Sequence, residues 1–431
     1  MNLRMKGRNM DNRILDQLED AYSEELTLVR GDLGQLEQSV EAIVKTLGAG
    51  LLQRLVNQGR NGYHGSCIPC SCDGSMRFVG HRSRRIHTLL GWITVRRGYY
   101  HCGHCGRSAA PYDQVSGLGS EQLSPALAKA CCLLAVDDSF EQVSKKIGCL
   151  FGQEISDTTI EWLAHQVGSV SVRQQEQEHQ RFEAQREIPT PQAQPRRLYV
   201  SVDGTTVHER EGWHEAKMGC IYWEDEQFKR RRCYVGRFCN SETFGWFVWL
   251  AACRCGLRQA PEVVYLGDGA AWIRSEHDRH FRRAVFIIDW YHASEHLWDC
   301  AKVLFGEGTR LTDQWVAERL SLLWQGQTRV LLENLKEQRR SRRGRKREAL
   351  ENLIRYISTN EQQMRYDVFR ARGYDIGSGA VEGSCKHVVG KRLKQSGMIW
   401  TRPGSSAVLA LRITWLNEQW QTFWEAKPMA A

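Results

Sequence analysis

The chain has 431 residues, a length that suggests about three domains. Its hydrophobic fraction of 42% supports a packed core and excludes wholesale disorder, while a net charge of +9 is compatible with a polyanionic partner without identifying one. Fifteen cysteines, no apolar leader segment at the N-terminus and no apolar run of membrane-spanning length favour a reducing cytoplasm, where thiols serve as metal ligands or as core residues.

Residues 1–60 are predicted to be a helical region. Within residues 12–58, apolar side chains recur in steps of three and four and form one stripe on a helix; they are Leu33, Leu36, Val40, Ile43 and Leu47. Such a stripe packs either on its own protein or in a short coiled coil that joins two copies. Because the pattern covers about two heptads, we favour packing on its own protein.

Residues 61–115 are predicted to be a zinc ribbon. Short β-like runs at 76–81, 85–91 and 92–100 separate two cysteine pairs, each in a tight turn. Four thiolates at such spacing can form the tetrahedron that Zn²⁺ prefers. The spacing therefore predicts one structural Zn²⁺ held by Cys67, Cys70, Cys102 and Cys105, with Cys70-x-Cys72 as a variant pairing.

Basic and aromatic residues alternate between the two cysteine pairs. They are Arg77, Arg82, Arg84, Arg85, Arg96 and Arg97, with Phe78, Trp92, Tyr99 and Tyr100. This composition suits phosphate contact and base stacking, but it equally suits a solvated basic face on a module with little core.

Residues 116–196 are predicted to be a helical, helix-turn-helix-like DNA-binding region followed by a linker. Residues 139–168 fit two helices with a short turn, and Ser156 or Asp157 is the expected N-cap of the second helix. Many helical pairs share this pattern, so it is a weak indication of specific DNA recognition. Residues 172–196 read as an exposed helix that runs into a proline-rich linker.

Residues 197–431 are predicted to be an RNase H-like core. Three strand-like runs at 198–207, 214–223 and 229–238 precede a helix at 242–256. Two short apolar runs follow, EVVYLGDGA and AVFIIDW, with a helix between them. The region 291–371 reads as an all-α insertion, and two more helices are expected at 378–396 and 404–424. The whole chain is thus predicted to be a multidomain α+β/α/β protein.

Three carboxylates stand out in this core. Asp203 and Asp268 each follow an apolar strand, and Glu382 lies near the start of a helix for which Ser378 is a plausible cap. Taken singly, each could be a turn residue or an acidic residue at a helix N-terminus. Together they suit the two Mg²⁺ (or Mn²⁺) ions that phosphodiester cleavage requires, because hard carboxylate oxygens are the natural ligands of Mg²⁺.

Long stretches of the chain resemble the DDE transposases of the ISKra-type insertion sequences, relatives of the Mutator-like group. The resemblance lies in TLLGWITVRRGYYHCGHCG, YVSVDGTTV, LGDGAAWI, IIDWYHASEHLW and GSGAVEGSCKHVVGKRLKQSGMIW. It implies that Asp203, Asp268 and Glu382 are the catalytic triad and that the helical stretch 291–371 is the insertion before the glutamate. It also implies a bacterial, nucleoid-associated enzyme that acts on double-stranded DNA, both transposon ends and target, as a homodimer or higher oligomer.

Asp289 and His292 resemble the D-x2-H element of Mutator-like enzymes. They follow the apolar run AVFII, which places them near the predicted active site. His292 and His296 are one helical turn apart and could bind metal on one face. We favour a supporting role, in which Asp289 and His292 orient the metal ligands, because the triad already supplies hard oxygen ligands.

Two basic segments are predicted to contact the DNA backbone. The first lies in the insertion and consists of Arg339, Arg340, Arg342, Arg343, Arg345, Lys346 and Arg347. The second follows Glu382 and consists of Lys386, Lys391, Arg392 and Lys394. A solvated, mobile loop is the alternative for the first segment.

Two other functions fit parts of the sequence. An RNase H-like nuclease or resolvase would use the same triad without strand transfer. A non-enzymatic regulator would bind DNA through the zinc ribbon and the helical pair, but this leaves the three carboxylates unexplained.

Overall fold

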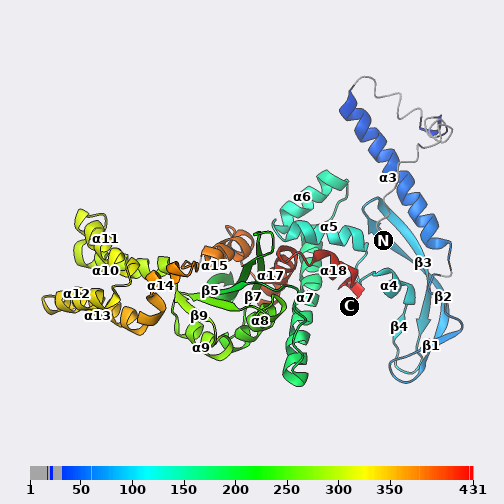
Figure 1. The fold of residues 1–431 in the computed structure, drawn as a ribbon. Helices are drawn as coiled ribbons and strands as arrows, with labels where there is room; N and C mark the ends of the chain where they lie inside the picture. Colours follow the sequence, from blue (N-terminus) through cyan, green and yellow to red (C-terminus); the bar gives the residue numbers. More distant parts are fainter. Residues whose placement is uncertain are drawn as a thin grey trace. The chain divides into compact units, whose positions relative to one another are not determined.

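The computed structural model describes residues 32–59, 61–377, 379–426 and 428–430, together with residue 17 and residues 20–22. It contains both helices and sheets, which confirms the predicted mixed α/β character, and the chain divides into two compact units (Figure 1). Unit 1 comprises residues 1–131, 141–160 and 427–431, and unit 2 comprises residues 132–140 and 161–426. No helix in the described part of the chain has the length and apolarity needed to cross a bilayer.

Unit 1 contains a four-stranded antiparallel sheet in the order β1-β2-β3-β4. The strands are β1 (Cys67–Pro69), β2 (Ser75–Thr88), β3 (Gly91–His101) and β4 (Ser108–Ala109). The first two β-like runs of the sequence merge into the single long strand β2, which accommodates a β-bulge between Phe78 and Gly80. The helices with residues in this unit are α3 (Leu33–Asn57), α4 (Pro111–Ser116), α5 (Pro125–Ala135), α6 (Phe140–Phe151), the start of α7 (Asp157–Gln185) and η3 (Pro428–Ala430).

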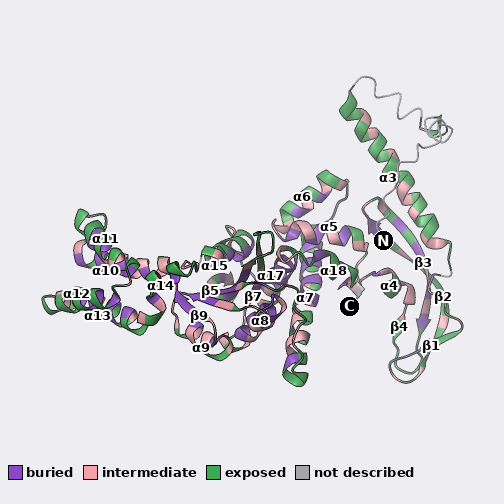
Figure 2. Cartoon of the chain, viewed as in Figure 1, coloured by how far each residue is buried: buried purple, intermediate pink, exposed green. Residues whose placement is uncertain are grey.

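Helix α3 packs on the sheet through a different face from the predicted one. Its residues Ala49, Leu52 and Val56 pack against a core formed by β2 and β3. Leu33 and Val40 of the predicted stripe are 72% and 48% exposed, and Figure 2 shows much of α3 coloured as exposed. The helix thus packs on its own protein, as predicted, but not through the predicted stripe.

Unit 2 is built on a five-stranded sheet in the order β7-β6-β5-β8-β9. Strands β5 (Arg197–Glu209), β6 (Gly212–Glu224) and β7 (Arg230–Arg237) form an antiparallel meander, whereas β8 (Glu262–Gly267) and β9 (Val285–Ile288) run parallel to β5. The helices α8 (Ser241–Arg254) and α9 (Ala271–His280) connect β7 to β8 and β8 to β9. The predicted strands and their order along the chain are confirmed, because their apolar runs fill the core of this unit.

The predicted all-α stretch at 291–371 consists of α10 (Trp290–Phe305), α11 (Arg310–Trp324), α12 (Thr328–Arg340), α13 (Gly344–Thr359), η1 (Glu361–Met364) and α14 (Tyr366–Ala371). Helices α12 and α13 pack side by side and form a helical hairpin (Figure 1). Leu331, Leu335, Leu350 and Leu353 are buried and fix this packing, because they recur at helical spacing on the facing sides.

The C-terminal part contains more and shorter helices than the two that the sequence predicts. The stretch 378–396 contains α15 (Gly379–Ser384), the π-helix η2 (Cys385–Gly390) and α16 (Lys391–Leu393), and the stretch 404–424 contains α17 (Arg402–Leu416) and α18 (Trp420–Glu425). Asn417 ends α17 because its side-chain amide bonds both the backbone N–H and the backbone C=O of Tyr234 on β7, at 2.7 and 2.9 Å. Glu418 then adopts a left-handed φ of 59°, which turns the chain into α18.

Two fully buried arginines connect this C-terminal part to residues 132–140. Arg392 donates to the backbone C=O of Ala135 at 2.7 Å and lies against the rings of Phe140 and Trp400. Arg412 donates to the Asp137 carboxylate at 2.6 Å and to the backbone C=O of Val136. Segment 132–140 is therefore an integral part of unit 2 even though unit 1 residues flank it in sequence.

Candidate active site and metal centre

Asp203 and Asp268 lie on two neighbouring parallel strands, just beyond the point where the pairing between β5 and β8 ends. Asp203 was predicted to follow its strand, but it lies within β5, which continues to Glu209 because β6 pairs with it along that whole length. The ladder between β5 and β8 pairs Ser201 with Leu266, so two residues further along each chain Asp203 and Asp268 are level with one another. Asp268 follows the last residue of β8, and Gly269 turns the chain with a φ of 88°. A Cβ on Gly269 would lie 2.9 Å from the Cδ1 of Ile288, so glycine is required there for both reasons.

The Asp203 carboxylate is partly buried among polar partners. Burial raises its pKa, and the negative charge of Asp268 raises it further, while the Gly204 N–H at 2.7 Å and the Cys385 thiol at 3.5 Å act in the opposite direction. Two nearby carboxylates that are partly withdrawn from water repel each other, so a bound cation would stabilise the pair. Cys385 was not singled out from the sequence; its position three residues after Glu382, on the same helical segment, was the available signal.

Glu382 lies in α15, and its side chain falls outside the part of the structure that is described, as does the predicted cap Ser378. The helix itself packs against β5 and β6. The residue that follows α15, Cys385, reaches Asp203. The segment that carries Glu382 is therefore next to the strand that carries Asp203.

Asp289 and His292 lie beyond the end of β9, the strand next to β8. Asp289 is 2% exposed and caps α10 by accepting a hydrogen bond from the His292 N–H at 2.8 Å. The His292 ring packs edge-on against the His296 ring, which in turn packs on Tyr356 with 3.8 Å between ring centroids. The Tyr356 hydroxyl donates to the backbone C=O of Asp268 at 3.2 Å, so this aromatic group supports the loop that carries Asp268.

The basic residues after Glu382 divide into two groups. Lys386, Lys391 and Lys394 are exposed; Lys391 pairs with Asp137 at 3.0 Å, and Lys394 bonds the Thr205 hydroxyl, two residues beyond Asp203. The prediction of DNA contact is wrong for Arg392, because its side chain is fully buried. Burial, together with the charge of Arg412, lowers the Arg392 pKa to about 10.

The basic block in the insertion lies at the junction of α12 and α13. Arg347 pairs with Glu351 at 3.0 Å, and Arg339 lies 3.8 Å from the same carboxylate. Arg340, Arg343, Arg345 and Lys346 are exposed. The N-terminus of α13 is the positive end of its helix dipole, and its first turn holds no acidic residue that would offset this charge. The cations at this end therefore add to the positive potential, and the arrangement favours a bound anion.

Four cysteine thiols meet in unit 1, and they differ from the predicted set by one member. The Sγ atoms of Cys70, Cys72, Cys102 and Cys105 all lie within 4.8 Å of one another. Cys67 is exposed on β1 and lies outside this cluster, so Cys72 takes its place. Two backbone turns shape the cluster, in which the Cys70 N–H donates to the Gly74 C=O and the Cys102 N–H to the Arg107 C=O.

The thiol geometry fits a tetrahedral ion. Neighbouring sulfurs lie 3.4 to 3.7 Å apart, close to the roughly 3.8 Å expected for Zn–S bonds of about 2.3 Å at tetrahedral angles. The backbone N–H groups of Cys105 and His104 lower the Cys102 pKa to about 6. The Gly74 N–H favours the Cys72 thiolate, but hydrogen bonds with the other thiols, led by Cys70, raise its pKa to about 12. The cluster could therefore hold a metal ion such as zinc.

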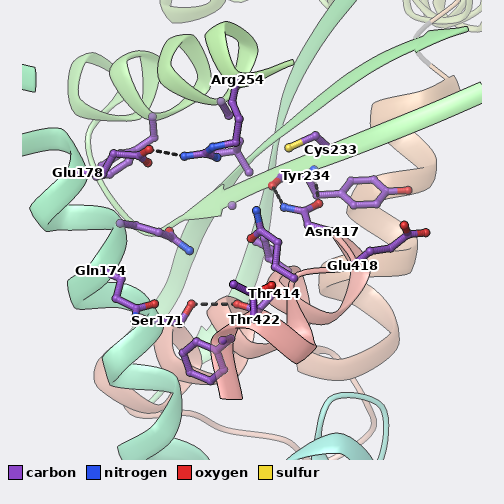
Figure 3. Close-up of a pocket in the computed structure, with 18 of the residues that line it drawn as sticks. Ser171, Gln174, Glu178, Cys233, Tyr234, Arg254, Thr414, Asn417, Glu418 and Thr422 are labelled. Carbon is purple, nitrogen blue, oxygen red and sulfur yellow. Dashed lines mark hydrogen bonds and ion pairs between the residues drawn. The ribbon is translucent and has the colours of Figure 1, made fainter. Parts of the chain in front are cut away.

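A cavity of about 590 Å³ lies elsewhere in unit 2, between α7, β7, α8 and the last two helices of the unit (Figure 3). Its lining is held by the ion pair between Glu178 and Arg254 and by a 2.9 Å hydrogen bond between Ser171 and Thr414. None of the predicted catalytic or DNA-binding residues lines it. A second acidic group, Glu209 with Glu211 and His214, lies at the hairpin between β5 and β6, but the buried Glu209 already binds Arg402 and Ser405 at 2.7 and 2.6 Å.

Comparison with known proteins places the chain in a family without assigning an activity. No match is found among curated proteins. One family model, described as an uncharacterised protein family, matches residues 75–423, which cover more than half of the chain. The matched range includes the three acidic residues and two cysteines of the cluster, Cys102 and Cys105, and begins after the other two. The chain therefore belongs to the uncharacterised protein family UPF0236.

Proposed function

We propose that the chain is a DDE transposase that cleaves transposon-end DNA and joins the resulting 3′-hydroxyl to target DNA. The observation that carries the proposal is that Asp203, within β5, and Asp268, directly after β8, lie level with one another on adjacent parallel strands, where the pairing of these strands ends. The sheet order β7-β6-β5-β8-β9, with three antiparallel strands followed by two parallel ones, supports an RNase H-like core. The resemblance to ISKra-type transposases supplies the reaction.

The donor set fits divalent ions, because both carboxylates offer hard oxygens and lie level with one another on adjacent strands. Asp203, Asp268 and Glu382 would hold the ions. Two bound Mg²⁺ (or Mn²⁺) ions would activate the attacking oxygen and stabilise the leaving oxygen. Water attack at the transposon end releases a 3′-hydroxyl, and this hydroxyl then attacks a target phosphodiester, whose own 3′ oxygen leaves. The three carboxylates act as ligands, and no covalent bond to the protein is needed.

Other residues of the chain have supporting roles in this proposal. The Asp289 carboxylate fixes the start of α10 by accepting a hydrogen bond from the His292 backbone N–H. Lys394 and the exposed cations at the junction of α12 and α13 would contact DNA phosphates. The cysteine cluster would hold one structural Zn²⁺.

The test is cleavage and joining of a labelled duplex that carries the DNA flanking the gene, in Mg²⁺ and a supercoiled target. Replacing a carboxylate by an amide keeps its shape but removes a negative charge facing the ions. Asp203→Asn, Asp268→Asn and Glu382→Gln should each nearly abolish both reactions and leave DNA binding intact. Asp278→Asn is the control, because that carboxylate is 64% exposed on α9.

The other possible results of this assay distinguish the alternative functions. Wild-type cleavage by one amide variant removes that residue from the triad, and two such results end the assignment. Cleavage without joining favours a nuclease or resolvase. Binding without any metal-dependent cleavage favours a DNA-binding regulator.

A further inference from the structure

The two long strands of unit 1, β2 and β3, present two faces that both carry arginines but differ in whether those arginines pair with a carboxylate. Residues 75–101 contain six arginines and no aspartate or glutamate. Since successive side chains of a strand point to opposite faces, the neighbouring arginines Arg84 and Arg85 belong to different faces, and so do Arg96 and Arg97. The cross-strand register pairs Arg84 with Val95 and Arg85 with Thr94.

The first face is internal and its charges are compensated. Ile86, Ile93 and Val95 are buried there against α3. Arg84 and Arg97 on this face both donate to the Asp113 carboxylate, at 2.9 and 2.7 Å. These two arginines therefore serve the fold of the module.

The second face is exposed and its charges are uncompensated. Arg85 and Arg96 are exposed, and within the described part of the chain no carboxylate lies within ion-pair distance of either guanidinium. The Arg85 guanidinium lies 4.8 Å from the centre of the Trp92 ring, which is itself 45% exposed. Trp92 stacks on His87 at 4.3 Å, and the buried His87 ring bonds the Gln153 side chain at 2.8 Å, so the aromatic surface is held in place.

The edge of β3 is not free to add a strand from a peptide. Along this edge, α3 takes up the backbone groups: the Asn57 amide donates to the Thr94 C=O and accepts from the Arg96 N–H, both at 2.8 Å. The Gln53 side chain accepts from the Thr94 N–H at 2.6 Å. Recognition by strand addition is therefore excluded at this segment, and the available surface is the face itself.

We propose that this face, formed by Arg85, Trp92 and Arg96, is a second surface for double-stranded DNA, separate from the acidic site and from the helical hairpin. Uncompensated guanidinium groups beside a fixed aromatic ring match the phosphate backbone of a duplex. The choice of DNA as the polyanion rests on the proposed function. The ribbon would hold one DNA segment while the sheet of unit 2 acts on the scissile phosphates.

The test is equilibrium binding of the full-length, zinc-loaded protein to a labelled 40-bp duplex, without Mg²⁺, across a salt series. The variant Arg85→Gln/Arg96→Gln removes two phosphate contacts and should lower the salt slope by about 1.8, at about 0.9 per contact. From 50 to 200 mM salt, the wild type should then lose about twelvefold more affinity than the variant. Arg282→Gln/Arg283→Gln is the matched control, because these two adjacent exposed arginines precede β9 at the opposite end of the sheet from the acidic site.

Trp92→Ala should weaken binding without changing the salt slope, because it removes surface and no charge. An unchanged slope for the arginine variant, or a loss of slope confined to duplex RNA, would overturn the proposal even if the protein cleaves DNA. If the arginine variant has a reduced salt slope but the wild-type protein cleaves no DNA in Mg²⁺, the DNA-binding face of β2 and β3 is upheld and the transposase proposal is rejected. Equal melting temperature and zinc content in variant and wild type establish that the fold is intact.

Discussion

Cys67 and Cys72 lie in the same module, and only Cys72 belongs to the cysteine cluster. Both are close in sequence to Cys70, but Cys72 has its Sγ 3.4 Å from that of Cys70, whereas Cys67 lies on β1 outside the cluster. Spacing alone could not decide between them, because the two-residue and one-residue gaps both permit a turn. What decides is the turn after Cys70, where the backbone of Gly74 approaches the Cys72 thiol.

We expect Cys72→Ser to lose most of the bound zinc and to unfold the ribbon, since metal binding supplies the folding energy of such modules. Cys67→Ser should retain about one zinc per chain. Elemental analysis with a thermal melt measures both. Equal zinc loss in the two variants, or zinc retention in Cys72→Ser, would contradict the cluster described above.

Asp137 is the residue on which two cations of unit 2 converge. Hydrogen bonds and charge from Arg412 and Lys391 outweigh the effect of partial burial and lower its pKa. Asp137→Asn should destabilise unit 2 by about 1–3 kcal/mol, because it leaves the buried Arg412 poorly compensated. The penalty is smaller than for a fully buried pair because the Asp137 side chain is 40% exposed.

The same carboxylate predicts a pH dependence. Since its folded-state pKa lies below the ordinary value near 4, its stabilisation is complete above that value and is lost as the pH falls through the folded-state pKa. Thermal melts of wild type and Asp137→Asn should converge below about pH 4. A constant difference down to pH 2 would show that the carboxylate charge is not the cause.

At the scale of elements, the hairpin of α12 and α13 carries a dense block of exposed cations. Replacing Arg340, Arg343, Arg345 and Lys346 by glutamine should weaken binding to all DNA sequences alike and flatten its salt dependence, because phosphate contacts carry no sequence information. The Arg282→Gln/Arg283→Gln protein serves again as the control. If the salt slope does not change, the block is a solvated loop.

Strands and helices that have a clear apolar pattern in the local sequence could be predicted. Contacts between residues far apart in the sequence could not. The apolar runs before Asp203 and Asp268 predicted β5 and β8, but the sequence did not show that β5 continues through Asp203 to Glu209, because that extension depends on pairing with β6. Arg392 looked solvent-facing because it lies among lysines. Its burial depends on Ala135, 257 positions away, and on the rings of Phe140 and Trp400. The break between α17 and α18 likewise depends on a contact with a distant strand, which local propensity does not encode.

At the scale of the molecule, unit 2 is assembled from two separate stretches of chain. The sequence indicated a core beginning at residue 197, whereas the compact unit also includes residues 132–140 and 161–196. Leu163, Val167 and Phe182 on α7 are buried. Their apolar surface and the carboxylate of Asp137 would both be lost from a fragment that begins at 197.

We therefore expect residues 132–426 to yield a folded protein with a cooperative thermal transition, and residues 197–426 to yield an aggregating or weakly cooperative one. Differential scanning calorimetry on the two fragments distinguishes these outcomes. A 197–426 fragment that melts cooperatively at the same temperature would show that the earlier segments contribute little.

Because unit 2 combines residues 132–140 with residues 161–426, it can close only after the C-terminal part has been synthesised. Asp137 and Arg412 are 275 positions apart, so at about 5–20 residues per second the ribosome needs roughly 14–55 s to deliver the second partner after the first. The strands that carry Asp203 and Asp268 emerge within this interval, before the segment that carries Glu382. A chain that stops before residue 382 would thus lack Glu382 and also Arg392 and Arg412, the arginines that connect the C-terminal part to residues 132–140. Under the proposed function, such an incomplete copy would have neither the third carboxylate nor a closed unit 2.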